Sequence, residues 1–298
     1  MAAHLPVPQT RHVDTADERR LRVAVAGDCS RVVVVHVGSP NACVLYDGWV
    51  QDAAARDLTL ITYDRPGYGG SSIQSGRTVA DCAADVRTIS HALGFERCAV
   101  WGFSGGGPHA LACGALLADL VVAVATIGSP APFDGPGLDY FAGMSEEARK
   151  DIELFGSDRA EWERKGEKQR DELLALSADE LCEQWSASAS PTDGVALRGE
   201  FGVWLHRSVQ AALAPGAEGW MADDIAVFHS PWGFDLRATS IPVKVWHGRE
   251  DHFVPFGHGR WLAATIPGAH AALRNHDGHL TVAADRIGEV HEWLAQYL

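Results

Sequence analysis

The chain has 298 residues, of which 46% are hydrophobic and 21% are charged, with 31 Gly and 14 Pro. This composition excludes a disordered protein, a collagen-like repeat and a coiled coil, and it suffices for one large α/β domain or one domain with an insertion. The 25 Lys and Arg against 39 Asp and Glu give a net charge of −14. Such acidity disfavours nucleic acid and anionic membranes as partners.

The N-terminal ten residues show no basic region followed by an apolar one, so no signal peptide is expected. The longest apolar runs, residues 32–37 and 120–127, are too short to span a bilayer. The six cysteines are scattered, without a CxxC pair or a zinc-type spacing. These features predict a cytoplasmic protein with reduced thiols.

Short apolar, β-branched runs alternate with helical patterns, which is typical of a mostly parallel sheet with crossover helices. The run RVVVVHV at residues 31–37 predicts a central strand that is buried on both faces. Further strands are expected in segments of similar character, at residues 21–26, 58–63, 98–103, 121–127, 243–247 and 271–273.

The clearest helical pattern covers residues 78–93. Thr78 is suited to be its N-cap, with Asp81 three residues later, and Gly94 is suited to end it. Between them, apolar residues recur at spacings of three and four. Helices are also expected at residues 108–117 and 284–298.

Strand character disappears between residues 133 and 235, and charge increases. Helices are expected there at residues 146–155, 159–176, 179–187 and 195–212. The third has a capping box at Ser177 and Glu180. Because strand character returns at residue 243, residues 133–235 are interpreted as a helical cap inserted into a core of residues 1–132 and 236–298.

Residues 102–106, with the sequence GFSGG, form a G-x-S-x-G motif. The motif alone is a weak signal, but here it ends an apolar strand and opens a helix, as a nucleophile elbow requires. The alternative is a glycine-rich turn without chemistry. Ser104 is therefore the predicted nucleophile, and it needs a base that a third group orients.

The predicted base is His279, one of 14 histidines. It lies in the loop after the last expected strand and before the final helix, and Gly278 gives this loop freedom to turn the ring toward Ser104. His276, three residues earlier in the same loop, is the alternative base.

The predicted acid is Asp251, in the turn after the strand at residues 243–247. This position lies at the carboxyl edge of the sheet, where such sites form. Asp134 is the alternative acid. The two N–H groups of an oxyanion hole are expected from Gly105, after the nucleophile, and from Ser39, in the loop after residues 31–37.

Half of the 10 tryptophans lie within residues 133–235. They either form an apolar roof over a pocket or pack the amphipathic helices onto the core, and the pattern does not separate these readings. The residues expected to line the pocket are Phe103, beside the nucleophile, and Trp232 and Phe234, where the cap rejoins the core.

With these motifs in order, the sequence resembles the α/β-hydrolase superfamily, in the form that carries a helical cap. The likeness covers nearly the whole chain, and its motifs are VVVVHVGSPN, YDRPGYGGSS, GFSGG, HGREDHFVP and the Gly278-His279 pair. One departure is that the family usually has His-Gly at the oxyanion loop, where this chain has Val37-Gly38. The resemblance implies an eight-stranded, mostly parallel sheet flanked by helices, and no metal or organic cofactor.

The resemblance also implies that Ser104, Asp251 and His279 are nucleophile, acid and base of a serine hydrolase. The predicted reaction cleaves an ester-like or other acyl bond of a small, hydrophobic molecule through an acyl-enzyme. Lactonases, carbon–carbon bond hydrolases, aminopeptidases and perhydrolases share this triad, so the fold does not choose the substrate. A non-catalytic small-molecule binding protein and a cofactor-independent oxygenase are the alternatives of other classes.

Overall fold

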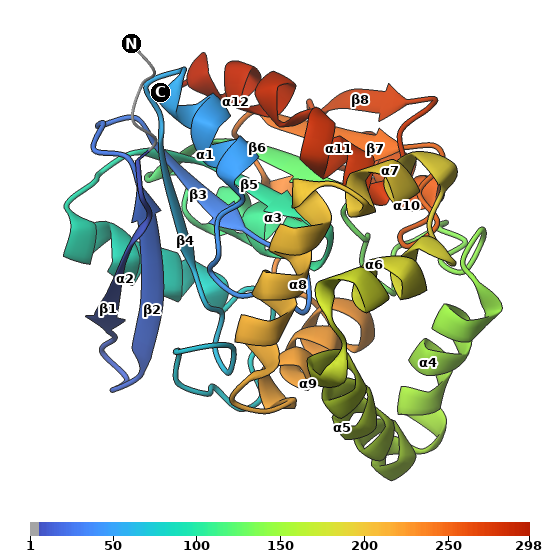
Figure 1. The fold of residues 1–298 in the computed structure, drawn as a ribbon. Helices are drawn as coiled ribbons and strands as arrows, with labels where there is room; N and C mark the ends of the chain where they lie inside the picture. The colour runs from blue at the N-terminus through green and yellow to red at the C-terminus, as the bar shows by residue number, and fades with distance from the viewer. Residues whose placement is uncertain (1–5) are drawn as a thin grey trace.

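In the computed structural model, which describes residues 6–298, one eight-stranded sheet runs through the molecule (Figure 1). Its strand order is β1-β2-β4-β3-β5-β6-β7-β8. β2 pairs antiparallel with β1 and with β4, and the other neighbours are parallel. The predicted α/β fold with a mostly parallel, eight-stranded sheet is confirmed. Residues 1–5, which belong to the N-terminal segment searched for a signal peptide, lie outside the described residues.

All the strands except β1, which is polar and mostly exposed, match strands predicted from the sequence. The strands are β1 Gln9–Asp14, β2 Arg20–Ala26, β3 Val32–His36, β4 Thr59–Tyr63, β5 Cys98–Phe103, β6 Val121–Ile127, β7 Val243–Gly248 and β8 His270–Arg274. Every residue of β3, β4 and β5 is buried, because helices cover both faces at the centre of the sheet. The continuous β-branched runs follow from this burial.

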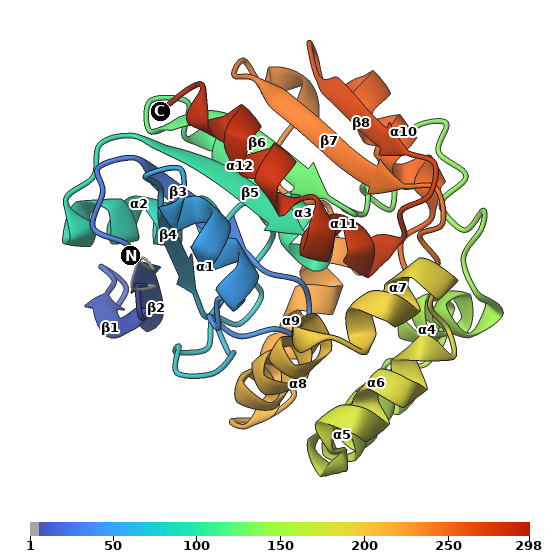
Figure 2. The ribbon, with the colours of Figure 1, turned by 45° about the horizontal axis from the view of Figure 1, so that its top comes forward.

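Two layers of helices cover the sheet (Figure 2). On one face lie α1 (Asp47–Ala54), α11 (His279–Asp285) and α12 (Ile287–Ala295), and on the other lie α2 (Cys82–Leu93), α3 (Gly107–Leu116) and α10 (Phe256–Thr265). The helix predicted at residues 284–298 is thus the second of two helices that meet at Arg286. Neither α1 nor α10 is predicted from the sequence.

The start of α2 differs from the prediction. The Asp81 carboxylate accepts hydrogen bonds from the Thr78 backbone N–H (2.6 Å) and hydroxyl (2.8 Å), and Asp81, not Thr78, occupies the N-cap position. The helix begins at Cys82 instead. At the other end Gly94 adopts a left-handed conformation, with φ of 75°, and ends the helix as predicted.

Between β6 and β7 the chain forms helices, which we call the helical segment (residues 133–235). These are α4 (Glu146–Ser157), α5 (Arg159–Ala175), α6 (Ala178–Ser186), α7 (Pro191–Leu197), α8 (Glu200–Leu213) and α9 (Glu218–Asp224). The capping box at Ser177 and Glu180 is present. The helix predicted at residues 195–212 is two helices, α7 and α8. No helix of the described residues is both long and apolar enough to cross a bilayer.

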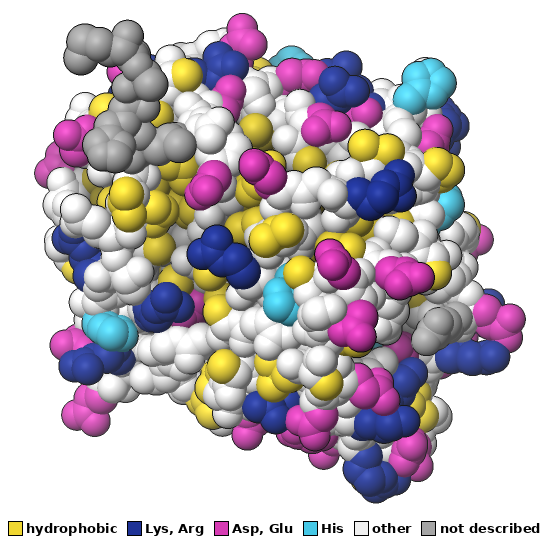
Figure 3. Space-filling model, in the orientation of Figure 1, with side chains coloured by type: hydrophobic (Ala, Val, Ile, Leu, Met, Phe, Trp, Pro, Cys, Tyr) yellow, Lys and Arg dark blue, Asp and Glu magenta, His cyan; other side chains and the backbone are white. Residues whose placement is uncertain are grey.

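Aromatic packing attaches α8 to the core. The ring of Trp204 lies 4.7 Å from that of Trp49 on α1, and its indole N–H donates to the Val44 carbonyl at 2.6 Å. Elsewhere on the helical segment, acidic and basic side chains are interspersed (Figure 3), with pairs such as Arg159–Glu163 along α5. Such exposed pairs contribute only about 0.3–0.5 kcal/mol each to the free energy of unfolding. The buried aromatic side chains of α8 therefore attach the helical segment to the core more strongly than the surface ion pairs do.

Candidate active site

Ser104 lies at the sharp turn between β5 and α3, with φ of 52°. Neighbouring backbone passes so close that a Cβ at Gly102 would lie 2.2 Å from the Gly106 oxygen, and one at Gly106 would lie 2.1 Å from the His36 oxygen. Both positions therefore require glycine. A left-handed conformation at a non-glycine residue is strained, and the surrounding core holds the serine in it. This is the geometry of a nucleophile elbow.

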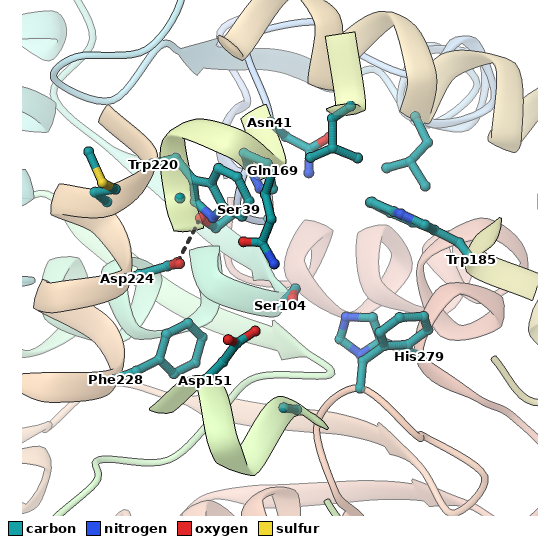
Figure 4. Close-up of a pocket in the computed structure, with 18 of the residues that line it drawn as sticks. Ser39, Asn41, Ser104, Asp151, Gln169, Trp185, Trp220, Asp224, Phe228 and His279 are labelled. Carbon is teal, nitrogen blue, oxygen red and sulfur yellow. Dashed lines mark hydrogen bonds between the residues drawn. The ribbon is translucent and has the colours of Figure 1, made fainter. Parts of the chain in front are cut away.

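The His279 ring and the Asp251 carboxylate form a hydrogen-bonded pair, with 2.7 Å between Nδ1 and Oδ2. The second carboxylate oxygen, Oδ1, accepts the backbone N–H groups of Phe253 (3.0 Å) and Val254 (2.7 Å). Because Asp251 is an acceptor, Nδ1 of His279 carries its proton and Nε2 is free to accept one. Figure 4 shows the ring beside Ser104 in one cavity that both residues line.

Burial opposes protonation of the His279 ring, but the charge and hydrogen bond of Asp251 outweigh it and raise the pKa of His279 above its ordinary value. His247, on β7, lies behind this pair, 3.4 Å from Asp251 and 2.9 Å from the Val254 carbonyl. Burial lowers the pKa of His247, so this ring stays neutral beside the carboxylate. His247 was not singled out from the sequence, because its role depends on contacts across the loop.

The loop after β3 passes close to Ser104. A Cβ at Gly105 would lie 3.5 Å from the Ser39 nitrogen, and one at Gly38 would lie 3.2 Å from the Ser104 Cβ. The two expected oxyanion donors, Ser39 and Gly105, therefore lie close to each other beside Ser104. The departure from the family's His-Gly sequence leaves this approach intact.

Arg65 holds that loop in place. Its guanidinium donates to the carbonyls of Val37 (2.7 Å) and Gly38 (3.0 Å), directly before Ser39. The same group pairs with Asp223 at the end of α9, a carboxylate that Arg77 also contacts at 2.7 Å. Burial opposes ionisation of Asp223, but the two guanidinium groups lower the pKa of this carboxyl. The helical segment thus contributes to the support of the oxyanion loop.

A cavity of about 530 Å³ opens above Ser104 and His279 (Figure 4). Its apolar wall is formed by six aromatic side chains, Phe103, Trp162, Trp185, Trp220, Phe228 and Phe253. Its polar groups include Asn41, Asp151, Lys165, Gln169, Glu172, Gln184 and Asp224. Most of these residues come from the helical segment, while the reacting groups come from the loops that follow the strands.

Comparison with known proteins identifies the family of this chain. Residues 31–282 match the family model described as the alpha/beta hydrolase fold. The chain belongs to this family. It is also similar, at 25% identity over 275 residues, to the AB hydrolase superfamily protein YisY of Bacillus subtilis (strain 168), covering 90% of this chain and 91% of that one. The predictions of an α/β hydrolase and of its fold are confirmed.

Solved structures of α/β hydrolases superpose along nearly the full chain. An esterase (EaEST) from Exiguobacterium antarcticum matches with a TM-score of 0.66 and 18% identity, over 97% of this chain and 99% of that one. The enol-lactonase from Burkholderia xenovorans LB400 matches with a TM-score of 0.68 and 18% identity, over 96% and 99%. At this level of identity the likeness shows the fold.

Two residues expected in the pocket of this α/β hydrolase lie elsewhere. Trp232 and Phe234 line a separate surface depression, and the Trp232 indole N–H donates to the Val227 carbonyl at 3.0 Å. The Trp232 carbonyl accepts the backbone N–H of Ala80, just before α2. The expectation is corrected because the chain leaves the helical segment along the α2 face of the core, away from Ser104. Three other tryptophans, Trp162, Trp185 and Trp220, line the cavity, whereas Trp204 packs on the core.

The alternative base and acid do not reach the cavity. The His276 side chain is 92% exposed and faces Glu250 at 3.9 Å. Asp134 lies at the depression near Trp232. Among residues 6–298, no cluster of three or more His, Cys, Asp or Glu side chains is arranged to bind a metal ion. Of the residues considered as nucleophile, acid or base, the structure brings together Ser104, Asp251 and His279.

Gly278 is a glycine for a different reason from the one expected. Its φ of −96° is open to other residues, so the loop does not depend on glycine's conformational freedom. A Cβ at Gly278 would, however, lie 2.2 Å from the Asp193 carboxylate and 2.4 Å from the Ser190 hydroxyl. Glycine is required because α7 of the helical segment approaches the His279 backbone closely. Nothing in the sequence pattern pointed to this contact.

Asp224 presents a carboxyl group to the cavity beside the oxyanion loop. It accepts a hydrogen bond from the Ser39 hydroxyl at 3.4 Å (Figure 4). Burial raises the pKa of Asp224 well above its ordinary value, and the neighbouring Asp223 carboxylate adds to the effect. Asp224 is not among the site residues predicted from the sequence.

Proposed function

We propose that this α/β hydrolase is a serine hydrolase that cleaves an ester-like or other acyl bond of a small, hydrophobic molecule. The observation that carries the proposal is that Ser104, at a strained elbow, and the His279–Asp251 pair open into one cavity. A serine hydroxyl becomes a nucleophile only beside such an oriented base, and the strained elbow presents it to the substrate.

In the first half-reaction the Ser104 oxygen attacks the carbonyl carbon while Nε2 of His279 takes the hydroxyl proton. Asp251 stabilises the imidazolium that forms, and the N–H groups of Ser39 and Gly105 donate to the oxyanion. When the intermediate collapses, the bond to the leaving group breaks and His279 gives that group the proton. The product is an acyl-enzyme on Ser104.

In the second half-reaction water replaces the leaving group. The oxygen of this water attacks the acyl carbon while His279 accepts a proton from it. The N–H groups of Ser39 and Gly105 again donate to the oxyanion. Collapse of this intermediate returns the proton to the Ser104 oxygen and releases the acid. Apart from the substrate and this water molecule, each step uses only side chains and backbone groups of this chain.

The cavity lining supports a neutral, hydrophobic substrate. Six aromatic side chains form its apolar wall. Lys165 is its one lysine among the described lining residues and is paired with Asp151, so it offers no free positive charge to an anionic substrate. The named esterase and enol-lactonase share the fold, which makes esters and lactones the first substrates to test.

We also propose that residues 133–235 act as a cap on a core formed by residues 1–132 and 236–298. The cavity is lined from both sides, by loops of the core around Ser39 and Ser104 and by helices of the helical segment. A substrate bound there would lie between the two, where water is excluded more completely than on an open surface.

Labelling with a fluorophosphonate tests the proposal directly. The wild-type protein is expected to form a covalent adduct on Ser104, and Ser104→Ala is expected to form none. A panel of p-nitrophenyl esters of increasing chain length, a lactone and a proline arylamide then identifies the bond type. An unlabelled Ser104 in folded wild-type protein would overturn the hydrolase proposal and favour a small-molecule binding protein. A labelled Ser104 with no turnover of the panel would point to a carbon–carbon bond or an unusual acyl group.

A further inference from the structure

We infer that Asp193, on α7 of the helical segment, is a positioning residue for His279, so that the helical segment takes part in catalysis instead of only covering the cavity. The inference rests on the proposed function, because it concerns how the base of that reaction is held. Asp193 lies 86 positions before His279 in the chain and is fully buried.

The Asp193 carboxylate accepts four hydrogen bonds from the first turn of α11. Oδ2 accepts the His279 backbone N–H at 2.8 Å. Oδ1 accepts the N–H groups of Leu280 (2.9 Å) and Thr281 (2.8 Å), and also the Thr281 hydroxyl at 2.7 Å. Both oxygens are used, and His279 itself is one of the residues bound.

These bonds replace an ordinary helix cap. The first N–H groups of a helix have no partner within the helix, and a side chain at the N-cap position usually accepts one of them. Here the N-cap position of α11 is Gly278, which has no side chain. Asp193 supplies the acceptor from another part of the fold, and Gly278 leaves the space that its approach requires. The position of His279 is thereby tied to the position of α7.

Asp193 is itself held firmly. It lies in the first turn of α7, where its backbone N–H donates to the Ser190 hydroxyl at 3.2 Å. A shift of α7 would therefore move the His279 backbone relative to Ser104. Misplacement of a catalytic group by about 1 Å lowers a rate by about 100-fold, so this link has a direct kinetic consequence.

Asp193 also adds negative charge near the base. The titratable or charged groups that face His279 are Asp251 and His247, from β7 and the loop after it, and Asp193 from α7. Asp251 has the larger effect, and the Asp193 charge also raises the pKa of His279. Removing that charge should therefore lower the pKa of the base, an effect that simple loss of stability would not produce.

The test compares Asp193→Asn and Asp193→Ala with Asp85→Asn as a matched control. Asp85 is also a buried aspartate, but it lies on α2 and accepts from Arg19 at 2.8 Å, away from the cavity. The measurements are the thermal unfolding midpoint and the second-order rate constant for Ser104 labelling by a fluorophosphonate across a range of pH.

We expect Asp193→Asn to slow labelling about tenfold, because its amide N–H₂ would face an N–H donor of the helix. Asp193→Ala should slow labelling about 100-fold. In Asp193→Asn, the pH at which labelling falls on the acid side should move to a lower value. Asp85→Asn should lower the unfolding midpoint while leaving both the labelling rate and its pH dependence close to wild type.

The inference is overturned if folded Asp193→Asn labels as fast as Asp85→Asn, or if its acid-side pH dependence stays at the wild-type position. Should Asp193→Ala fail to fold, Asp193→Asn decides alone, since it keeps the size of the side chain. Failure of wild-type protein to label would instead contradict the proposed function. The two failures are therefore distinguishable in one set of measurements.

Discussion

The two sides of the site are held by different parts of the molecule. Ser104 is positioned inside the core, where the contacts of Gly102 and Gly106 with neighbouring backbone leave the elbow no other path. His279 lies at the start of a helix whose first N–H groups are bound by Asp193 from the helical segment. The position of Ser104 is thus set by the sheet itself, whereas the position of His279 depends on where a helix of the helical segment docks.

Two buried aspartates of the helical segment, Asp223 and Asp193, differ in the kind of group that balances their charge. Asp223 is neutralised by the guanidinium groups of Arg65 and Arg77 and reaches the oxyanion loop through Arg65. Asp193 contacts backbone N–H groups and one hydroxyl, so its charge is balanced by the dipoles at the start of α11. Loss of the first leaves buried cations, while loss of the second leaves unpaired backbone groups.

The largest expected effect tests the histidine side. His279→Ala should lower fluorophosphonate labelling and ester hydrolysis by a factor on the order of 10⁶, because Ser104 loses its base. His276→Ala is the matched control, since its side chain is 92% exposed, and it should stay within about twofold of wild type. Equal losses in both variants would refute the assignment of His279.

The next effect tests the support of the oxyanion loop. Asp223→Asn should destabilise the protein by about 3–5 kcal/mol, because two guanidinium groups would remain buried without their carboxylate. Denaturant unfolding measures this free energy. Asp119→Asn is the control, because Asp119 pairs with Arg87 on the exposed surface, and it should leave the free energy of unfolding close to that of wild type. A small change for Asp223→Asn would show that Arg65 holds the loop without help from the helical segment.

A smaller effect is expected on the nucleophile side. Gly106→Ala should cost about 3 kcal/mol of stability, because its Cβ would meet the His36 oxygen at 2.1 Å and backbone must shift. Gly257→Ala in α10 is the control, since a Cβ there has open space, and it should be neutral or slightly stabilising. Thermal unfolding compares the two variants. A harmless Gly106→Ala would contradict the view that backbone contact fixes the elbow.

The smallest expected effect is the change in the rate of hydrolysis with pH. His279 must be neutral to accept the Ser104 proton, and its pKa is raised above the ordinary value of about 6.5. Hydrolysis should therefore fall as pH decreases through a value above about 6.5, by about tenfold per pH unit beyond it. The dependence of kcat/KM on pH measures this. An acid-side midpoint well below 6.5 would mean that burial outweighs Asp251 at this ring.

Much of the core was predictable because strands and the elbow leave local patterns. The run at residues 31–37, the G-x-S-x-G motif and the capping box at Ser177 each depend on residues close together in the chain. Ser104, Asp251 and His279 were each predicted from a place shortly after a strand, and these strands are β5, β7 and β8. Even local patterns have limits, however, since Asp81 binds Thr78 and α2 begins at Cys82.

What the sequence determined by itself is therefore the sheet, the elbow and the residues that meet at its carboxyl edge. Only the tertiary structure decided that Trp232 packs away from the cavity and that Asp193 and Asp223 support the reacting loops. The contact from Asp193 to His279 joins residues 86 apart, and that from Arg65 to Asp223 joins residues 158 apart. The periodicity of apolar residues in the sequence indicates which face of a helix or strand is buried. Which other element packs against that face is decided by how the helices dock on the sheet.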